Sequence, residues 1–430
     1  MGNWKDIYKQ KLVTVEEAAA KIESGDKCWL GPCSAAPIQL MEAICDRVAE
    51  LKDVDIVSGM ALYPFKMFQS PDYIGRINYS TIFYGAMERK FFGVGNVSVN
   101  SVHLSHVASC LKNIYKVNTL LADVSLPDEE GYMYYGPMGV AANGEVADYA
   151  TKIIVQVNKY QPKVTGVKHR IHVSQVSCIC ECDHKLPELP QPEVSEIDKK
   201  IAELLIDRVE DGSCIQIGLG GLANAVGYGL KDKKDLSVHT EMFTDSMVYL
   251  AKKGTISGKM FAAFGLGNNE LYEFVGEGWV ELCPISFVND PLEIAKKDNF
   301  VSINACLMAD LTGQVCSETL GHYIYSSTGG QLEYAKGAAR SAGGQSFLCM
   351  PSTVKNKDGS MGSTITLNLP AGEVVTTPRS EVVSVVTEYG IADLVDQPIR
   401  ERVKRMIAIA HPDFREKLHA QALEAGLIRE

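Results

Sequence analysis

The stretch Gly212-Ser-Cys-Ile-Gln-Ile-Gly-Leu-Gly-Gly-Leu-Ala223 predicts a strand that enters a glycine turn and leaves it as a helix. A second short apolar run, Asp235-Leu-Ser-Val-His239, follows that helix and predicts another strand. A strand, a helix and a second strand form a βαβ unit, in which the two strands are parallel and both faces of the sheet are covered. The stretch therefore places this part of the chain in the α/β class.

The first half of the chain repeats this pattern. Gly25-Asp-Lys-Cys-Trp-Leu-Gly31 predicts a strand and a glycine turn, a helical stretch follows, and Asp53-Val-Asp-Ile-Val57 predicts the next strand. We therefore expect two related halves. When the halves are aligned on these strands, Gly59 in the first takes the place that Glu241 takes in the second. The alignment places a carboxylate at this position in the second half alone.

A proline-rich segment separates the two halves. Leu186-Pro-Glu-Leu-Pro-Gln-Pro-Glu193 favours an extended linker, because proline ends helices and cannot donate to a sheet. Ser195 then fits the N-cap of a helix. We expect two tandem, topologically related open α/β domains, residues 1–185 and 195–430, joined by a linker at 186–194. The active site is expected in the cleft between them, as is usual for such folds.

The composition excludes several classes of protein. The 430 residues include 42 basic and 53 acidic side chains, giving a net charge of −11, and 46% are hydrophobic. This composition is globular, and it lacks the basic excess of a nucleic-acid-binding protein. The 12 cysteines are scattered and form no Cys-x-x-Cys pair, which favours buried, reduced thiols over disulfides or a metal site. No apolar run has the ~18 residues that a membrane span needs. We expect a cytoplasmic protein that uses neither metal nor membrane.

The glycine turn is the strongest candidate for a functional site. Its pattern fits the dinucleotide fingerprint, and Glu241 lies 23 residues after Gly218, where a ribose-binding acid would stand. An NAD-dependent dehydrogenase is therefore one hypothesis. Two further glycine turns, Ser327-Thr-Gly-Gly330 and Ala342-Gly-Gly-Gln345, favour a different chemistry. Several turns around one acid suit a site where backbone amides hold a reacting carbonyl oxygen.

The order of motifs along the chain resembles the acetyl-CoA hydrolase/transferase group of family I CoA-transferases, closest to the 4-hydroxybutyrate and butyrate CoA-transferases. The resemblance covers nearly the whole chain and rests on motifs in both halves. In the first half these are His103-Leu-Ser105, Pro127-Asp-Glu-Glu-Gly-Tyr132 and Val157-Asn158. In the second half they include Gly218-Leu-Gly-Gly-Leu-Ala-Asn-Ala-Val226, His239-Thr-Glu-Met242, Ser302-Ile-Asn304, Asp310-Leu-Thr-Gly-Gln314, Gly329-Gly-Gln331, Gly337-Ala-Ala-Arg340, Thr377-Pro-Arg-Ser380, Val386-Thr-Glu-Tyr-Gly-Ile-Ala392 and Ala410-His-Pro-Asp-Phe-Arg415.

The resemblance implies that Glu241 is a nucleophile. Its carboxylate would attack an acyl-CoA thioester to give an acyl-glutamyl anhydride and CoA thiolate. The thiolate would then attack the glutamyl carbonyl, releasing the acid and leaving a glutamyl-CoA thioester, so the kinetics are ping-pong. A glutamate with a pKa near ~4.3 is ionised at neutral pH and needs no base. Each addition produces an oxyanion that hydrogen-bond donors must stabilise.

The resemblance also assigns supporting roles. The backbone amides of Leu219 and Gly330 are the candidate oxyanion donors, and Gln216 and Asn304 are candidate side-chain donors near the carboxylates. The residues that would lie against CoA are Gly218, Leu219, Gly220, Gly221, Leu222, Gly329, Gly330 and Lys355. Three other basic residues, Lys336, Arg340 and Lys357, are further candidates for the CoA phosphates. As a separate hypothesis, Tyr63, Pro64 and Phe65, together with residues 83–87, are candidates for the acyl pocket from the first half.

Several alternatives stay open at this point. An acyl-CoA hydrolase would use the same site, and a CoA-responsive binding protein would use the same fold without catalysis. Glu388 and Asp245 could compete with Glu241 for the catalytic role. The chain also departs from many relatives, which have a proline where this chain has Leu222-Ala223. The resemblance implies CoA as a cosubstrate, no permanently bound cofactor, a small carboxylic acid as acceptor, and a homodimer or higher homo-oligomer.

Overall fold

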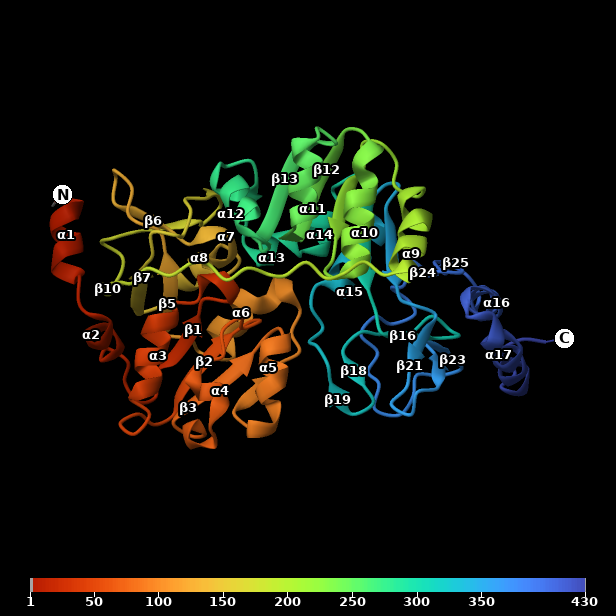
Figure 1. Cartoon of the computed structure of the whole chain (residues 1–430), viewed down its shortest axis with the longest axis horizontal. Helices are drawn as coiled ribbons and strands as arrows, with labels where there is room; N and C mark the ends of the chain where they lie inside the picture. The colour runs from red at the N-terminus through yellow and green to blue at the C-terminus, as the bar shows by residue number, and fades with distance from the viewer. Residues whose placement is uncertain (1–2, 430) are drawn as a thin grey trace. The chain divides into compact units, whose positions relative to one another are not determined.

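The computed structural model describes residues 3–429, which divide into two compact units. The first unit contains the residues up to Pro190, Glu241–Asp245 and Met260–Val288. The second unit contains Gln191–Thr240, Ser246–Lys259 and the residues from Asn289 onward. Each unit therefore combines segments that are far apart in the sequence, as the colours in Figure 1 show.

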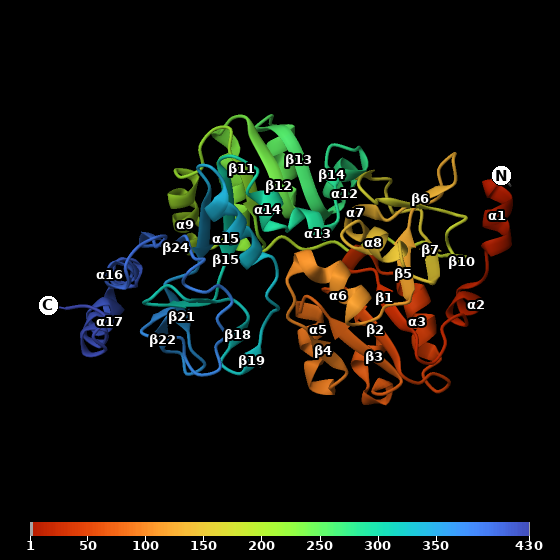
Figure 2. The same cartoon turned by 180° about the vertical axis from the view of Figure 1, so that it is seen from behind.

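The first unit is built on a parallel sheet with the strand order β10-β7-β5-β1-β2-β3-β4. Its strands are β1 (Lys27–Leu30), β2 (Val54–Ser58), β3 (Ile77–Thr81), β4 (Val97–Val99), β5 (Thr119–Val124), β7 (Lys152–Val157) and β10 (Cys178–Glu181). Figure 2 shows β1, β2 and β3 side by side. Every residue of β5 is buried, and successive residues point to opposite faces, so the middle of the sheet is covered on both sides.

The helices of the first unit are short. They are α1 (Trp4–Lys11), α2 (Val15–Ala19), α3 (Ile38–Asp46), α4 (Lys66–Gln69), α5 (Ala86–Phe91), α6 (Val107–Asn113), α7 (Gly136–Gly139), α8 (Asn143–Ala147), α12 (Asn269–Gly276) and α13 (Ile285–Val288). A small antiparallel pair, β6 (Tyr132–Tyr134) and β9 (Arg170–His172), lies outside the main sheet. The chain runs from β1 through α3 to β2, which pairs with one edge of β1, whereas the later strand β5 pairs with the other edge. The strand order therefore changes direction between β1 and β5.

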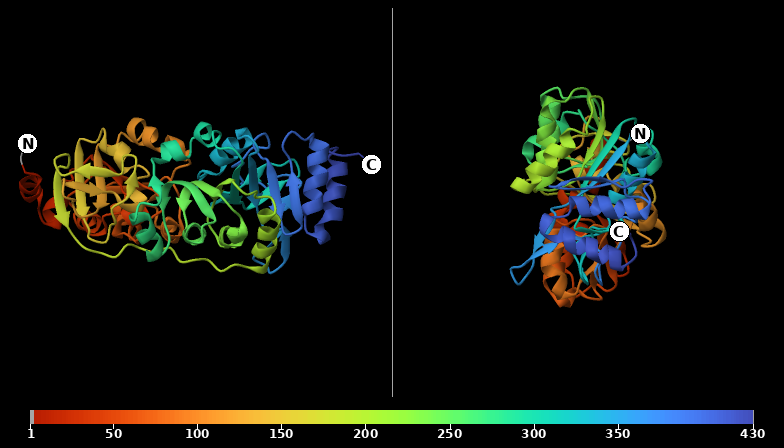
Figure 3. Two further views of the ribbon diagram at one scale, coloured as in Figure 1. Left: turned by 90° about the horizontal axis from the view of Figure 1, so that it is seen from above. Right: turned by 90° about the vertical axis from the view of Figure 1, so that its right-hand side faces the viewer.

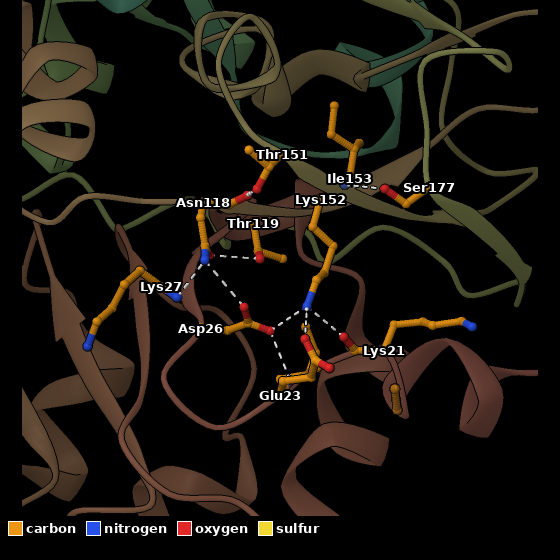
Figure 4. Close-up of polar contacts among 12 residues, drawn as sticks. Lys21, Glu23, Asp26, Lys27, Asn118, Thr119, Thr151, Lys152, Ile153 and Ser177 are labelled. Atoms are coloured by element: carbon orange, nitrogen blue, oxygen red, sulfur yellow. Dashed lines mark hydrogen bonds and ion pairs between the residues drawn. The ribbon is translucent and has the colours of Figure 1, made fainter.

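Polar side chains tie together the amino ends of β1, β5 and β7 (Figure 4). The Lys152 ammonium lies 2.7 Å from Asp26 Oδ2 and also donates to the Lys21 carbonyl oxygen. Asn118 donates to Asp26 and accepts from the Lys27 N–H. Asp26 is 6% exposed, so its charge is compensated by these neighbours rather than by solvent.

The second sheet has the strand order β25-β24-β20-β15-β11-β12-β13-β14-β8. Its strands are β11 (Cys214–Ile217), β12 (Leu236–Phe243), β13 (Ile256–Gly265), β14 (Glu281–Leu282), β15 (Phe300–Ala305), β20 (Gln345–Cys349), β24 (Ser384–Thr387), β25 (Gly390–Asp393) and β8 (Thr165–Gly166). The strands from β24 to β11 are parallel, and β25 pairs antiparallel with β24.

The two sheets share one topology, which confirms the prediction of related halves. In the first sheet β1 lies inside, with β2, β3 and β4 on one side and the later strands on the other. In the second sheet β11 takes the place of β1, with β12, β13 and β14 on one side and the later strands on the other, and β8 is added at the edge beside β14. The turns before matching strands also agree: Gly25 and Gly212 have φ values of +88° and +80°, and Asp53 and Asp235 both have φ of +55°. Non-glycine residues rarely adopt positive φ, so this agreement reflects one backbone plan used twice.

The remaining helices are α9 (Glu196–Ile206), α10 (Gly221–Gly229), α11 (Asp245–Lys252), α14 (Pro291–Ile294), α15 (Gln331–Arg340), α16 (Ile399–Ile409) and α17 (Pro412–Glu424). The predicted N-cap is confirmed, because Ser195 accepts from the Asp198 N–H and the two residues form a capping box at the start of α9. Helices α16 and α17 pack on each other and on one hydrophobic core that includes Val385, Val403 and Leu418 (Figure 3).

Short strands complete the second unit. They are β16 (Met308–Asp310), β17 (Val315–Cys316), β18 (Thr319–Leu320), β19 (Tyr323–Ile324), β21 (Thr353–Lys355), β22 (Met361–Ser363) and β23 (Ile365–Thr366). Across residues 3–429, no helix has both the length and the apolar character needed to span a membrane. The 12 cysteines are all free thiols.

Candidate functional site

The glycine turn after β11 needs glycine at three positions for three different reasons. At Gly218 an added Cβ would lie 3.0 Å from Asn304 Oδ1. Gly220 has φ of +115°, which side-chain-bearing residues rarely adopt. At Gly221 an added Cβ would lie 2.6 Å from the Glu193 carbonyl oxygen, on the segment that leads into α9. The turn is therefore shaped by its neighbours as well as by its own backbone.

Gln216, Ser302 and Asn304 form a closed hydrogen-bonded ring directly before this turn. The Ser302 hydroxyl donates to Gln216 Oε1 at 2.7 Å, and Gln216 Nε2 donates to Asn304 Oδ1 at 3.0 Å. Asn304 Nδ2 donates to both Gln216 Oε1, at 3.1 Å, and Ser302 Oγ, at 3.0 Å. Gln216 and Ser302 are opposite each other in β11 and β15, and Asn304 is two residues further along the same face. Both predicted amide side chains therefore belong to one group.

The backbone N–H groups of Leu219, in the glycine turn, and of Gly330, directly before α15, are unpaired within the described chain. Gly218 N–H donates to the Ile303 carbonyl oxygen at 2.9 Å, but the N–H of Leu219 finds no acceptor among residues 3–429, and neither does that of Gly330. Leu219 is 41% exposed, so this part of the turn is open. Backbone N–H groups left free in this way can hold an oxyanion. Leu219 and Gly330, the two candidate oxyanion donors, therefore each have a backbone N–H without an acceptor among residues 3–429.

Gly330 is held by its neighbour Gln331. Gly329 has φ of +60°, and α15 begins directly after Gly330. Gln331 is buried, and its Nε2 donates to Thr377 Oγ1 at 3.3 Å. Thr377 is in turn bridged to Val315. The turn at Gly329 and Gly330 is therefore anchored to the interior of the second unit.

Glu241 lies in β12, near its carboxyl end, and is half-buried. The strands β11 and β12 pair with an offset of 23 residues, since Ile215 is opposite Val238. The same 23 residues separate Gly218 from Glu241 in the sequence. His239 is fully buried, and its ring packs edge-on against Phe300 with the centroids 6.2 Å apart, in agreement with a packing role.

The two competing acids are used in other ways. The Glu388 carboxylate accepts from both the N–H and the hydroxyl of Ser352, at 2.8 and 2.6 Å. Asp245 Oδ1 accepts from the Asn268 N–H at 3.1 Å, just before α12. The Glu388 carboxylate therefore holds the loop at Ser352, and the Asp245 carboxylate holds the loop at Asn268.

The basic candidates differ in how free they are. Lys355 and Lys357 lie on the exposed β21–β22 hairpin and have no ion-pair partner among the described residues. Lys336 lies on α15, and its carbonyl oxygen accepts from Arg340. The Arg340 guanidinium also lies 3.9 Å from Glu381. The ammonium groups of Lys336, Lys355 and Lys357 therefore have no ion-pair partner among the described residues, and Arg340 is the basic candidate that has one. No cluster of side chains suited to a metal ion occurs within residues 3–429.

Sequence reasoning missed one buried carboxylate in the first unit. Glu88 is fully buried and accepts from the N–H groups of Ala61 and Gly85, at 2.8 and 2.9 Å, and from the hydroxyls of Tyr79 and Thr81. Burial raises its pKa, and these hydrogen bonds oppose the rise. Glu88 thus pins the loops after β2 and β3, which contain the aromatic candidates for the acyl pocket. A glutamate in a mixed stretch such as Met-Glu-Arg-Lys gives no sign of burial.

Both halves of the chain match one protein family. The acetyl-CoA hydrolase/transferase N-terminal domain matches residues 2–189, and the C-terminal domain of that family matches residues 267–422. The chain is 39% identical to succinyl-CoA:cyclohexane-1-carboxylate CoA transferase of Geobacter metallireducens, over 97% of this chain and 96% of that protein. It is 36% identical to 4-hydroxybutyrate coenzyme A transferase of Clostridium kluyveri, over 96% of this chain and 98% of the relative.

Solved structures agree with this. RipA from Yersinia pestis has a TM-score of 0.91 and 32% identity, covering 99% of this chain and 100% of that chain. A 4-hydroxybutyrate CoA-transferase from Porphyromonas gingivalis has a TM-score of 0.82 and 29% identity, covering 98% of this chain and 100% of that chain. These matches favour the CoA-transferase interpretation of the glycine turn over the dinucleotide interpretation. The chain belongs to the acetyl-CoA hydrolase/transferase family.

Proposed function

We propose that this protein transfers CoA between a short-chain acyl-CoA, such as acetyl-CoA or butyryl-CoA, and a small carboxylic acid. Glu241 attacks the thioester carbonyl, forming an acyl-glutamyl anhydride and releasing CoA thiolate. The thiolate attacks the glutamyl carbonyl, which releases the acid and leaves a glutamyl-CoA thioester. The acceptor acid then reverses these steps. The observation that carries the proposal is the family match in both halves of the chain.

Hydrogen-bond donors within the second unit support the roles assigned to its own residues. The unpaired N–H groups of Leu219 and Gly330 are the donors for the oxyanion of each addition. Gln216 supplies an additional side-chain donor, because one hydrogen of its Nε2 is not used within the ring.

CoA itself is the cosubstrate in this proposal. The thioester end of CoA lies against the backbone of two glycine turns, formed by Gly218, Leu219, Gly220, Gly221 and Leu222 and by Gly329 and Gly330. Lys355 binds the CoA phosphates. The acceptor belongs to the small carboxylic acids, with 4-hydroxybutyrate, butyrate and acetate as the first to test. We further propose a homodimer or higher homo-oligomer and a cytoplasmic location, which suits twelve free cysteines.

The decisive experiment is an intact-protein mass after mixing with acetyl-CoA, with and without borohydride. We expect the wild-type protein to gain the mass of a CoA thioester, and borohydride to remove the CoA by reducing the thioester. The Glu241→Gln variant should gain nothing. Glu203→Gln, an exposed position on α9, is the matched control and should behave as wild type. A wild-type protein without any adduct would overturn the transferase mechanism.

The same mixture separates a transferase from a hydrolase. Free CoA that accumulates without an added acid shows that water takes the acyl group. Conversion of added butyrate or 4-hydroxybutyrate into its CoA thioester, with release of acetate and without free CoA, shows transfer. We expect the consumption of acetyl-CoA to depend on the added acid, with ping-pong kinetics when the concentrations of both substrates are varied.

A further inference from the structure

Ser302 is fully buried in β15 and is the one member of the ring that carries a hydroxyl group. Its position opposite Gln216 places the hydroxyl between the two amide side chains. The hydroxyl both donates, to Gln216 Oε1, and accepts, from Asn304 Nδ2. A hydroxyl can do both at once, which an alanine in its place cannot.

Among the residues that the structure describes, the ring leaves one amide hydrogen without an acceptor. Asn304 Nδ2 spends its two hydrogens on Gln216 Oε1 and Ser302 Oγ. Gln216 Nε2 spends one on Asn304 Oδ1 and keeps the other. If both amides turned over together, every bond would persist with the hydroxyl reversed, and the free hydrogen would then belong to Asn304. In either arrangement the ring offers one N–H donor.

We propose that Ser302 is a positioning residue that keeps this single donor fixed at the carboxyl ends of β11 and β15. The inference rests on the proposed function, because it assumes that the donor serves the oxyanion formed on Glu241. A donor that is already oriented stabilises the transition state without reorganising during the reaction, so its loss lowers kcat more than it changes KM. Without the hydroxyl, Gln216 Oε1 and Asn304 Nδ2 each lose a partner, and the amide planes are free to rotate.

The position also explains the glycine at 218. An added Cβ there would stand 3.0 Å from Asn304 Oδ1, which is the atom that accepts from Gln216. Gly218 in the turn therefore lies close to Asn304 of the ring, and the buried Ser302 hydroxyl holds the two amide side chains. The role of Ser302 is therefore to act through Gln216 and Asn304 rather than on the substrate.

The test compares Ser302→Ala with Ser346→Ala. Ser346 is directly opposite Ser302 in β20 and 1% exposed, and its hydroxyl has no hydrogen-bond partner among the described residues. The two variants therefore remove the same group at the same level of the sheet. We expect Ser302→Ala to lower kcat about 10- to 100-fold with KM changed less than about twofold, and Ser346→Ala to keep both values. Ser302→Thr, which keeps the hydroxyl, should recover most of the loss.

Formation of the CoA adduct separates this inference from the proposed function. If the wild-type protein forms the adduct and Ser302→Ala forms it at the wild-type rate, the role of Ser302 is wrong while the function of Glu241 stands. Equal losses in the Ser302 and Ser346 variants would also overturn it, because the effect would then be one of packing. Ser302→Cys keeps the shape of the side chain with a weaker donor, and should give an intermediate kcat at an unchanged melting temperature.

Discussion

His184 and Asp123 form a buried pair at the carboxyl end of β5. His184 Nε2 lies 3.4 Å from Asp123 Oδ2, and that carboxylate also accepts from Gln156, Asn158 and Gln161. Burial raises the pKa of Asp123, although the hydrogen bonds from His184 and the amides oppose the rise. Burial alone would lower the pKa of His184, but the hydrogen bond and charge of Asp123 outweigh it and raise this pKa. His184 therefore holds its proton more tightly in the folded protein than in the unfolded chain.

This pair makes stability depend on pH in a defined direction. Because the folded pKa of His184 is raised, its contribution is complete below the ordinary value of about 6.5 and is lost as the pH rises through the folded value. Because the folded pKa of Asp123 is also raised, its contribution to stability is likewise lost as the pH rises, but at lower pH than that of His184. We expect the stability advantage of wild type over His184→Asn to shrink as the pH rises above the ordinary imidazole pKa of about 6.5, measured by urea unfolding. An advantage that stays constant over that rise in pH would show that the pair does not titrate on folding.

At the scale of elements, Lys152 joins three strands at their amino ends. Its ammonium compensates the buried Asp26 carboxylate, whose other donors within residues 3–429 are Asn118 and the Glu23 N–H. We expect Lys152→Met to lower the free energy of unfolding by about 3 kcal/mol, because it leaves a buried charge without its partner. The matched control is Lys168→Met, whose ion pair with Asp148 is exposed and should cost less than about 1 kcal/mol. Equal effects in the two variants, measured by chemical denaturation, would contradict this account.

The elements were largely predictable from the sequence, but the contacts between them were not. Local signals placed the strand, the glycine turn and the helix at Gly212–Ala223, and they placed the cap at Ser195. The ring of Gln216, Ser302 and Asn304 depends on the register of strands whose residues are 86 to 88 positions apart in the sequence. The hydrophobic pattern within one segment does not predict which residues of a distant strand will lie opposite it. The same reason hid Glu88, whose carboxylate is held by the loops after β2 and β3.

At the scale of the whole molecule, the thiols report on the integrity of the fold. Ten of the 12 cysteines are buried, and only Cys110 and Cys182 are half-buried. Burial raises the pKa of the Cys45 and Cys180 thiols to about 12, so little reactive thiolate exists there at neutral pH. We expect a thiol reagent to label at most two cysteines in the native protein and all 12 in denaturant. Rapid labelling of more than two, followed by mass spectrometry, would contradict the described burial.

The shared backbone plan has a consequence for how the two halves have diverged. Counting six residues from the matching turns at Asp53 and Asp235 leads to Gly59 and Glu241. At Gly59 an added Cβ would lie 3.0 Å from Ile82 Cγ1, so the interior of the first half has closed over the site of the missing carboxylate. A side chain at position 59 would press against Ile82, which would have to shift or be replaced by a smaller residue. The same position of the shared backbone plan therefore holds a carboxylate in the second half and borders on a neighbouring side chain in the first.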